Sequence, residues 1–170
     1  DEVTIELPMR IVKQAEAEMG TAYKLPVSYD VMRRMLDEFR RPGRKGGGGF
    51  YDYPEGGRKH LWTGLKDAFP VAAEQPDVEE VKKRILYIQA LETARCLEEG
   101  VLTDPVDGDL GSVLGWGFPT YAGGTISLID TVGLPEFVAE CDSLAQRFGG
   151  RFLPSDWLRQ KAAAGSCFYS

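Results

Sequence analysis

The segment "DVEEVKKRILYIQALETARCLEEG", from Asp77 to Gly100, decides the fold class of this sequence. Asp77 and Glu80 stand at the spacing of a capping box, and Gly100 is a typical helix stop. Apolar residues recur at the spacing of one helical face, at Val78, Val81, Ile85 and Ile88. The segment therefore predicts a long amphipathic helix.

Shorter helices are expected on both sides of this segment, separated by glycine and proline. The expected ranges are 8–19, 28–39, 103–113, 126–131, 135–148 and 155–164. Ser28 is placed to cap the second of these helices. We find no convincing strand alternation, so the predicted fold class is all-α.

Composition limits the classes of function. The chain has 170 residues, 43% of them hydrophobic, and no apolar run long enough to span a bilayer. The net charge of -6 argues against broad binding to nucleic acids or anionic membranes. The three cysteines form no CxxC pair, which favours reduced thiols in a cytoplasmic protein. The chain opens without methionine or a leader, so we expect it to be part of something larger.

Two parts of the chain are alike. "KLPVSYDVMRRMLDEF" at 24–39, followed by "GGGGFYDY" at 46–53, parallels "RFLPSDWLRQKAAAGSCFYS" at 151–170. The preceding segments, 1–20 and 130–149, also correspond. We therefore predict tandem helical repeats. Residues 1–56 would be the C-terminal part of the first repeat, 57–76 a connector, and 77–170 a complete second repeat.

The stretch "RKGGGGFYDY" at 44–53 invites a phosphate-binding interpretation. A Walker loop requires Gly-Lys-Ser/Thr after its glycines, whereas Lys45 precedes this run. A Rossmann loop joins a strand to a helix, whereas this run follows an expected helix. Two interpretations stay open: an anion nest of glycine amides beside Arg44 and Lys45, and a structural turn with close backbone packing.

Other candidate motifs are weaker. "DPVDGD" at 104–109 lacks the closing glutamate of a calcium loop and is better explained as a capped helix start with solvated acids. His60 has no recognisable catalytic partner nearby in the sequence, so we expect a surface or connector residue. No metal site is predicted.

At this point the residues carry a family resemblance. "RPGRKGGGGFYDY" at 41–53 resembles the GRKxGxGFYxY ending of the helical C-terminal domain in 3-hydroxyacyl-CoA dehydrogenases. Residues 90–133 look like the last domain of the bacterial multifunctional fatty-acid β-oxidation alpha subunit, which combines this dehydrogenase with an enoyl-CoA hydratase. The most specific parts are "CLEEGV", "GWGFPTYAGG" and "IDTVG", in that order. The implied fold is a pair of repeats of the 6-phosphogluconate dehydrogenase C-terminal-domain type.

The resemblance implies a parent oxidoreductase of lipid metabolism that converts (3S)-hydroxyacyl-CoA to 3-ketoacyl-CoA with NAD. The NAD and the catalytic His and Glu belong to a Rossmann domain that is not in this sequence. The family's helical asparagine, in a Val-Asn-Arg context, is replaced in "VKKRIL" by Lys83, followed by Arg84. We therefore expect no catalytic, cofactor-binding or metal residue in this chain, and no activity from it alone.

The expected role is architectural. The second repeat would brace the first, as partner subunits do in single-repeat relatives, and close one wall of the acyl-CoA cleft. The implied partners are the Rossmann domain, acyl-CoA, and a second copy or a thiolase subunit. Arg44 and Lys45 are candidates for contact with a CoA phosphate. The alternative is that they are solvated surface cations without a ligand. The alternatives are a noncatalytic helical module for dimerisation or partner docking and, more remotely, an anion-binding module at the glycine run.

Overall fold

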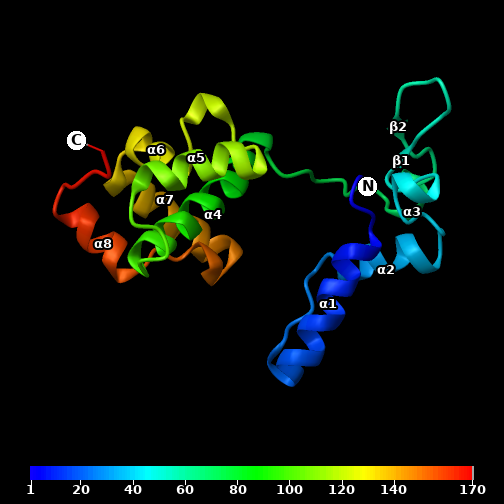
Figure 1. Ribbon diagram of the computed structural model, residues 1–170, viewed down its shortest axis with the longest axis horizontal. Coiled ribbons are helices and arrows are strands. Elements are labelled where there is room, and N and C mark those ends of the chain that lie inside the picture. Colours follow the sequence, from blue (N-terminus) through cyan, green and yellow to red (C-terminus); the bar gives the residue numbers. More distant parts are fainter. Residues whose placement is uncertain (170) are drawn as a thin grey trace. The chain divides into compact units, whose positions relative to one another are not determined.

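The computed structural model describes residues 1–169, and helices dominate that range (Figure 1). The prediction of an all-α fold is confirmed. The chain forms two compact units, Asp1–Ala73 and Glu74–Ser170. The α-helices of the first unit are α1 (Glu6–Met19), α2 (Tyr29–Asp37) and α3 (Leu65–Ala68). Those of the second are α4 (Val78–Glu98), α5 (Pro105–Trp116), α6 (Thr125–Val132), α7 (Leu134–Phe148) and α8 (Asp156–Ala163).

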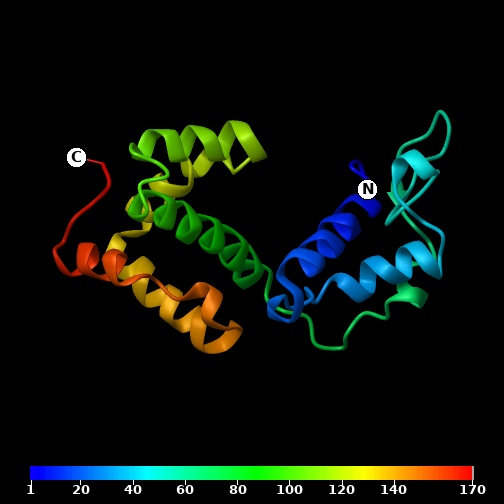
Figure 2. The ribbon, with the colours of Figure 1, turned by 60° about the horizontal axis from the view of Figure 1, so that its bottom comes forward.

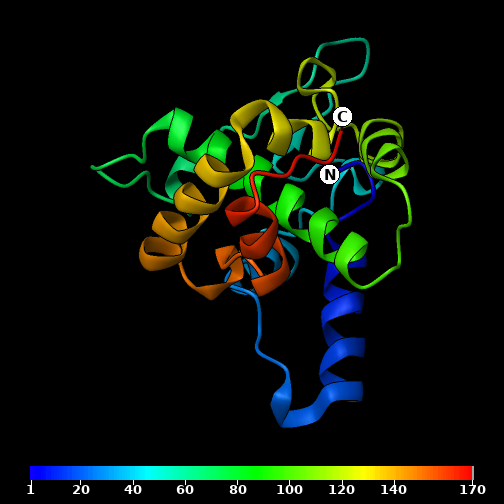
Figure 3. The ribbon, with the colours of Figure 1, turned by 90° about the vertical axis from the view of Figure 1, so that its left-hand side faces the viewer.

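In the first unit, α1 and α2 follow one another through the short 3-10 helix η1 (Gly20–Ala22). Figure 3 shows the far end of α1, with η1, extending away from the rest of this unit. Met9 and Val12 on α1 and Met35 on α2 are buried. The predicted cap at Ser28 is wrong: its side chain accepts no capping hydrogen bond. Its backbone is already helical, whereas a capping serine adopts an extended conformation.

A small ribbon, which the sequence did not indicate, follows the glycine run. Strand β1 (Tyr51–Asp52) pairs antiparallel with β2 (His60–Leu61), Tyr51 opposite Leu61. Two residues cannot display an alternating pattern, so periodicity gives no signal for such strands. A backbone hydrogen bond of 2.9 Å from Trp62 to the Phe50 carbonyl extends the pairing.

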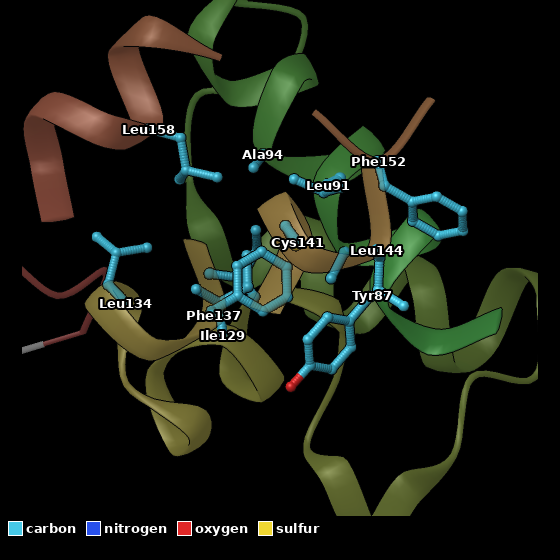
Figure 4. Packing of buried hydrophobic residues seen from close by; sticks show 12 residues of the cluster. Tyr87, Leu91, Ala94, Ile129, Leu134, Phe137, Cys141, Leu144, Phe152 and Leu158 are labelled. Atoms are coloured by element: carbon cyan, nitrogen blue, oxygen red, sulfur yellow. The ribbon is translucent and has the colours of Figure 1, made fainter. Parts of the chain in front are cut away.

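In the second unit, α6 packs against α4, α5 and α7, and α7 also packs against α8 (Figure 2). The core gathers side chains from α4, α6, α7 and α8 (Figure 4). At its centre, Phe137 is fully buried and its ring centroid lies 4.7 Å from that of Tyr87. Burying such aromatic side chains contributes about 1.5–3 kcal/mol each.

The capping of α4 is confirmed, but its expected apolar face is not the buried one. The Asp77 carboxylate accepts a hydrogen bond of 2.9 Å from the Glu80 amide. Val78 and Ile85, by contrast, are more than half exposed. The buried stripe is formed instead by Tyr87, Ala90, Leu91, Thr93 and Ala94. Alanines allow neighbouring backbones to approach closely, although they add little to a hydrophobic pattern.

The same order of elements occurs in both units. Helix α1, η1, the pair Leu25-Pro26 and α2 correspond to α7, the 3-10 helix η4 (Gly150–Phe152), Leu153-Pro154 and α8. The end of α8 is followed by Gly165 and the pair Phe168-Tyr169, and the end of α2 by the glycine run and Phe50-Tyr51. The similarity seen in the sequence is thus accompanied by a similar succession of helices.

Candidate functional site

In each unit, an aspartate carboxylate binds the backbone of a Phe-Tyr pair. The oxygens of Asp1 accept hydrogen bonds from the amides of Phe50 (3.0 Å) and Tyr51 (2.9 Å). In the second unit, Asp130 accepts from the amides of Phe168 (2.9 Å) and Tyr169 (2.9 Å). Asp1 and Asp130 also occupy matching positions in the two similar segments. We call these two arrangements the carboxylate clamps.

The glycine run packs against the Asp1 clamp. Gly43 and Gly47 have positive φ angles of 121° and 90°. A Cβ on Gly49 would lie 2.3 Å from a carboxylate oxygen of Asp1, so a side chain has no room there. The amides of Gly46, Gly47, Gly48 and Gly49 all donate to carbonyls within the loop. These donors are already used, so the geometry favours the structural turn over the anion nest.

Arg41 spans this loop from the other side. Its Nε donates to the Gly49 carbonyl (2.7 Å) and its Nη2 to the Tyr51 carbonyl (3.1 Å). The guanidinium also pairs with Asp52 and lies 4.6 Å from the centroid of the Trp62 ring. A planar, multidentate cation suits this position, in which carbonyls, a carboxylate and an aromatic face converge.

The predicted phosphate contacts, Arg44 and Lys45, are exposed residues next to this loop. Arg44 pairs with Glu2 at 3.0 Å, and its guanidinium lies 5.6 Å from the Tyr53 ring centroid. The hydrogen bond with Glu2 raises the pKa of Arg44, and the same contact lowers the pKa of Glu2. Lys45 lines an open cavity of about 400 Å³ with Glu2, Glu6 and Arg10. An incoming phosphate would therefore compete with Glu2 for Arg44.

Lys83 lies in a polar cluster on α4 and α7. It pairs with Glu140, which also accepts a hydrogen bond from the Tyr87 hydroxyl. Burial opposes ionisation of Glu140, but the bonds from Lys83 and Tyr87 outweigh it and lower the pKa of that carboxyl. Burial and the bond to Glu140 raise the pKa of Tyr87. Arg84 lies with its guanidinium 4.0 Å from the Phe148 ring centroid.

Asp109 contradicts the expectation of solvated acids in "DPVDGD". Asp104 does cap α5, accepting from the Val106 amide at 2.9 Å. Asp109, however, is only 6% exposed and accepts from the Ile126 amide (2.6 Å) and the Tyr169 hydroxyl (2.7 Å). It thereby caps α6 from another helix, and no spacing rule within one helix signals such a contact. Among residues 1–169 no cluster suited to a metal ion occurs.

A further cavity, about 350 Å³ in volume, lies between α4 and α5; we call it the α4–α5 cavity. Gly108 and Gly111 of α5 contribute to its wall, and Trp116 lies at one end, donating to Gln89 Oε1 at 2.7 Å. The other lining residues are Glu92, Thr93, Cys96, Val101, Leu102 and Asp107. The sequence did not indicate this cavity, because nothing in the local pattern shows that Gly108 and Gly111 face another helix.

The remaining candidates are peripheral. His60 is exposed on the ribbon, with its Nδ1 3.9 Å from an Asp52 carboxylate oxygen. All three cysteines are free thiols: Cys141 is buried, Cys96 partly buried and Cys167 exposed. Within the described residues, no helix has the length and apolar character needed to cross a membrane.

Comparisons with known proteins show which proteins the chain is similar to. No family model matches the chain. A fatty acid oxidation complex subunit alpha from Shewanella halifaxensis is 36% identical over 174 residues, which cover 100% of this chain and 24% of that relative. Over its whole length the chain is similar to a part of fatty acid oxidation complex alpha subunits. The resemblance seen in the sequence is thereby confirmed.

Other relatives show a comparable similarity. The corresponding subunit of Shewanella amazonensis is 34% identical over 99% of this chain, and that of Vibrio vulnificus is also 34% identical over 99%. The chain spans about a quarter of the length of the curated relatives it matches: 24% of the Shewanella amazonensis subunit and 23% of the Vibrio vulnificus subunit.

Proposed function

We propose that this chain is the C-terminal helical region of an NAD-dependent 3-hydroxyacyl-CoA dehydrogenase of fatty-acid β-oxidation. The observation that carries the proposal is homology over the whole chain to fatty acid oxidation complex alpha subunits. The parent would oxidise (3S)-hydroxyacyl-CoA, with NAD held by a Rossmann domain, and would also carry an enoyl-CoA hydratase. Its further partner would be a thiolase subunit or a second copy, in the bacterial cytoplasm.

The proposed division of the chain follows the repeats. Residues 1–56 would be the C-terminal part of the first repeat, 57–76 a connector, and 77–170 a second repeat. The two carboxylate clamps support this division, because Asp1 and Asp130 each bind the backbone of a Phe-Tyr pair in the same manner. On this basis the chain would contribute structure to the parent enzyme, as one wall of the cleft and as a packing surface between repeats or subunits.

The apolar surface of α4 supports a packing role. Ile85 is 55% exposed, and with Val81 and Ile88 it lines an open cavity beside Phe152, so the apolar stripe on this helix is only partly covered within the second unit. Exposed apolar stripes of this kind commonly mark interfaces. We test the role in the complete parent enzyme by Ile85→Asp, which should lower its thermal transition and its dehydrogenase activity. Val27→Asp, at a 98% exposed position, is the matched control and should change neither. Equal behaviour of the two variants would remove this support.

A direct test separates the chain from its parent. With NAD and a 3-hydroxyacyl-CoA, the chain alone should form no NADH, whereas the parent that includes the upstream reading frame should form it. That frame should encode a GxGxxG strand–turn–helix and a His and Glu pair. Turnover by the chain alone would contradict the proposal that the catalytic groups lie elsewhere, and an unrelated upstream domain would remove the enzyme hypothesis.

Arg44 and Lys45 are retained as proposed contacts for a CoA phosphate. Because Glu2 pairs with Arg44, Glu2→Gln should tighten CoA binding, whereas Arg44→Ala and Lys45→Ala should weaken it. Isothermal titration of the chain with CoA measures all three effects. Weak binding that is the same in every variant would exclude the contact.

The competing proposal is a noncatalytic helical module for dimerisation or partner docking. The same partly covered stripe on α4 favours it, since the exposed Ile85 could meet a covering surface without any reaction chemistry. The two proposals differ in what lies upstream and in whether the complete protein reduces NAD.

A further inference from the structure

Helix α5 has an unusual distribution of side chains. Its small or polar residues Gly108, Asp109 and Ser112 are buried, whereas its large apolar residues face outwards. Val106, Leu110 and Leu114 recur every four residues and are 45%, 54% and 81% exposed. They form one stripe about 12 Å long on the helix. We call these three residues, together with the exposed Trp116, the α5 face.

The α4–α5 cavity adjoins this face. Trp116 belongs to both, and Gly111, which follows Leu110, lines the cavity. A Cβ built on Gly111 would meet no atom within 4 Å. A cavity of about 350 Å³ beside an apolar stripe can accept a large apolar side chain while the stripe contacts the rest of an amphipathic helix.

The charge around the α5 face indicates what kind of partner could bind there. From Cys96 to Gln146 the sequence contains no Lys, Arg or His, but it does contain several acids. Asp107 is exposed and lines the cavity; Glu92, at the same cavity, pairs with Arg95. An apolar surface in acidic surroundings favours an apolar partner with cationic flanks.

We propose that the α5 face docks an amphipathic helix of a partner protein whose apolar side is flanked by Lys or Arg. One large apolar side chain of that helix enters the α4–α5 cavity, and its cations face Asp104 and Asp107. The same acids disfavour a fatty acid, an acyl-CoA or an anionic membrane, each of which brings negative charge. They also disfavour a symmetric contact between two copies of this face, which would oppose like charges. This docking does not depend on the proposed enzymatic parent.

The test uses the whole chain and a dye-labelled Leu/Lys peptide whose leucines lie on one helical side, followed by fluorescence anisotropy. The peptide should bind, and its affinity should fall as salt rises, because the cationic contacts are screened. Gly111→Leu fills the cavity, and Asp107→Lys reverses one charge; each should weaken binding about tenfold or more. Circular dichroism should show the same helix content in every variant.

Matched controls make the result decisive. Gly115→Leu introduces the same side chain one turn further along α5, also where a Cβ meets no atom within 4 Å but outside the cavity lining, and should not weaken binding. A Leu/Glu peptide of the same pattern and decanoate should bind at least tenfold more weakly than the Leu/Lys peptide. The proposal is overturned if either binds as tightly as the Leu/Lys peptide. It is also overturned if Gly111→Leu binds the Leu/Lys peptide like the unchanged chain.

Discussion

The hydroxyl of Tyr169 donates a hydrogen bond of 2.7 Å to the buried carboxylate of Asp109. This bond joins the C-terminal segment to α5, sixty residues earlier in the chain. Tyr169 is also held through its amide by Asp130 on α6. The last described residue of the second unit is therefore a structural component of the helix packing.

Tyr169→Phe should destabilise the second unit by about 1–2 kcal/mol, because a buried carboxylate loses one of its donors while its bonds to α6 remain. Urea unfolding followed by circular dichroism measures the change. Tyr121→Phe is the control, since Tyr121 is 83% exposed, and it should have little effect. Equal stability of the two variants would show that the contact with Asp109 contributes nothing.

Alkaline pH should destabilise the second unit from about pH 9 upwards. Burial raises the pKa of Cys141 from its ordinary 9.0 to about 12, and burial with the bonds to Glu140 and Asp109 raises the pKa values of Tyr87 and Tyr169 above the ordinary 10.0. As pH rises past these ordinary values, the unfolded chain loses these protons while the folded chain keeps them. The unfolded state then binds fewer protons, so the free energy of unfolding falls as pH rises.

Thermal unfolding between pH 8 and 11 measures this dependence. Tyr169→Phe should make it less steep, because one of the three groups with a raised pKa, namely Tyr87, Tyr169 and Cys141, is removed. An unchanged pH dependence in that variant would contradict the assignment of the effect to Tyr169.

Gly124→Ala should destabilise the protein by more than about 2 kcal/mol, because two costs combine at this position. Gly124 has a φ of 134°, and its Cβ would lie 2.3 Å from Asp109 Oδ1. Gly115→Ala is the matched control: the residue is helical, its Cβ meets nothing, and we expect it to stabilise the chain by about 0.5–1 kcal/mol. Chemical denaturation of both variants gives the comparison, and similar values would contradict the steric argument.

The three thiols should react at very different rates. Burial raises the pKa of Cys141 to about 12, so almost no thiolate is present at neutral pH, and the side chain is inaccessible. Cys167 is exposed. A maleimide at pH 7 should label Cys167 first and Cys141 only after unfolding, as mass spectrometry of peptides would reveal. Rapid labelling of Cys141 in the folded chain would contradict the described core.

Much of the helical organisation could be predicted from the sequence. Strong local signals, such as the Asp77 cap and the glycines after helices, act within a few residues and are visible in the chain itself. The long helix illustrates the limit of periodicity. Two apolar stripes run along α4, and the buried one includes Ala90 and Ala94, whose small side chains give a weak hydrophobic pattern but allow close packing.

The candidate sites were less predictable. Asp109 stands in a run of acids, and its burial depends on Ile126, Ser127 and Tyr169, which are remote in sequence. The glycine run was recognised as a structural turn or an anion nest. Its own amides bond to carbonyls of the loop, which favours the turn, and the contact between Asp1 and Phe50, forty-nine residues apart, adds a long-range partner that the sequence did not indicate. Long-range partners of charged groups are set by the tertiary fold, which local patterns do not contain.

The two carboxylate clamps have a consequence for the tolerance of substitutions. In each clamp one aspartate binds two backbone amides, so the attachment of the segment does not depend on which side chains stand at the two positions that it holds. The aromatic residues there can be exchanged while the segment stays attached. The aspartates have no such freedom, because loss of either carboxylate leaves two amides without that acceptor.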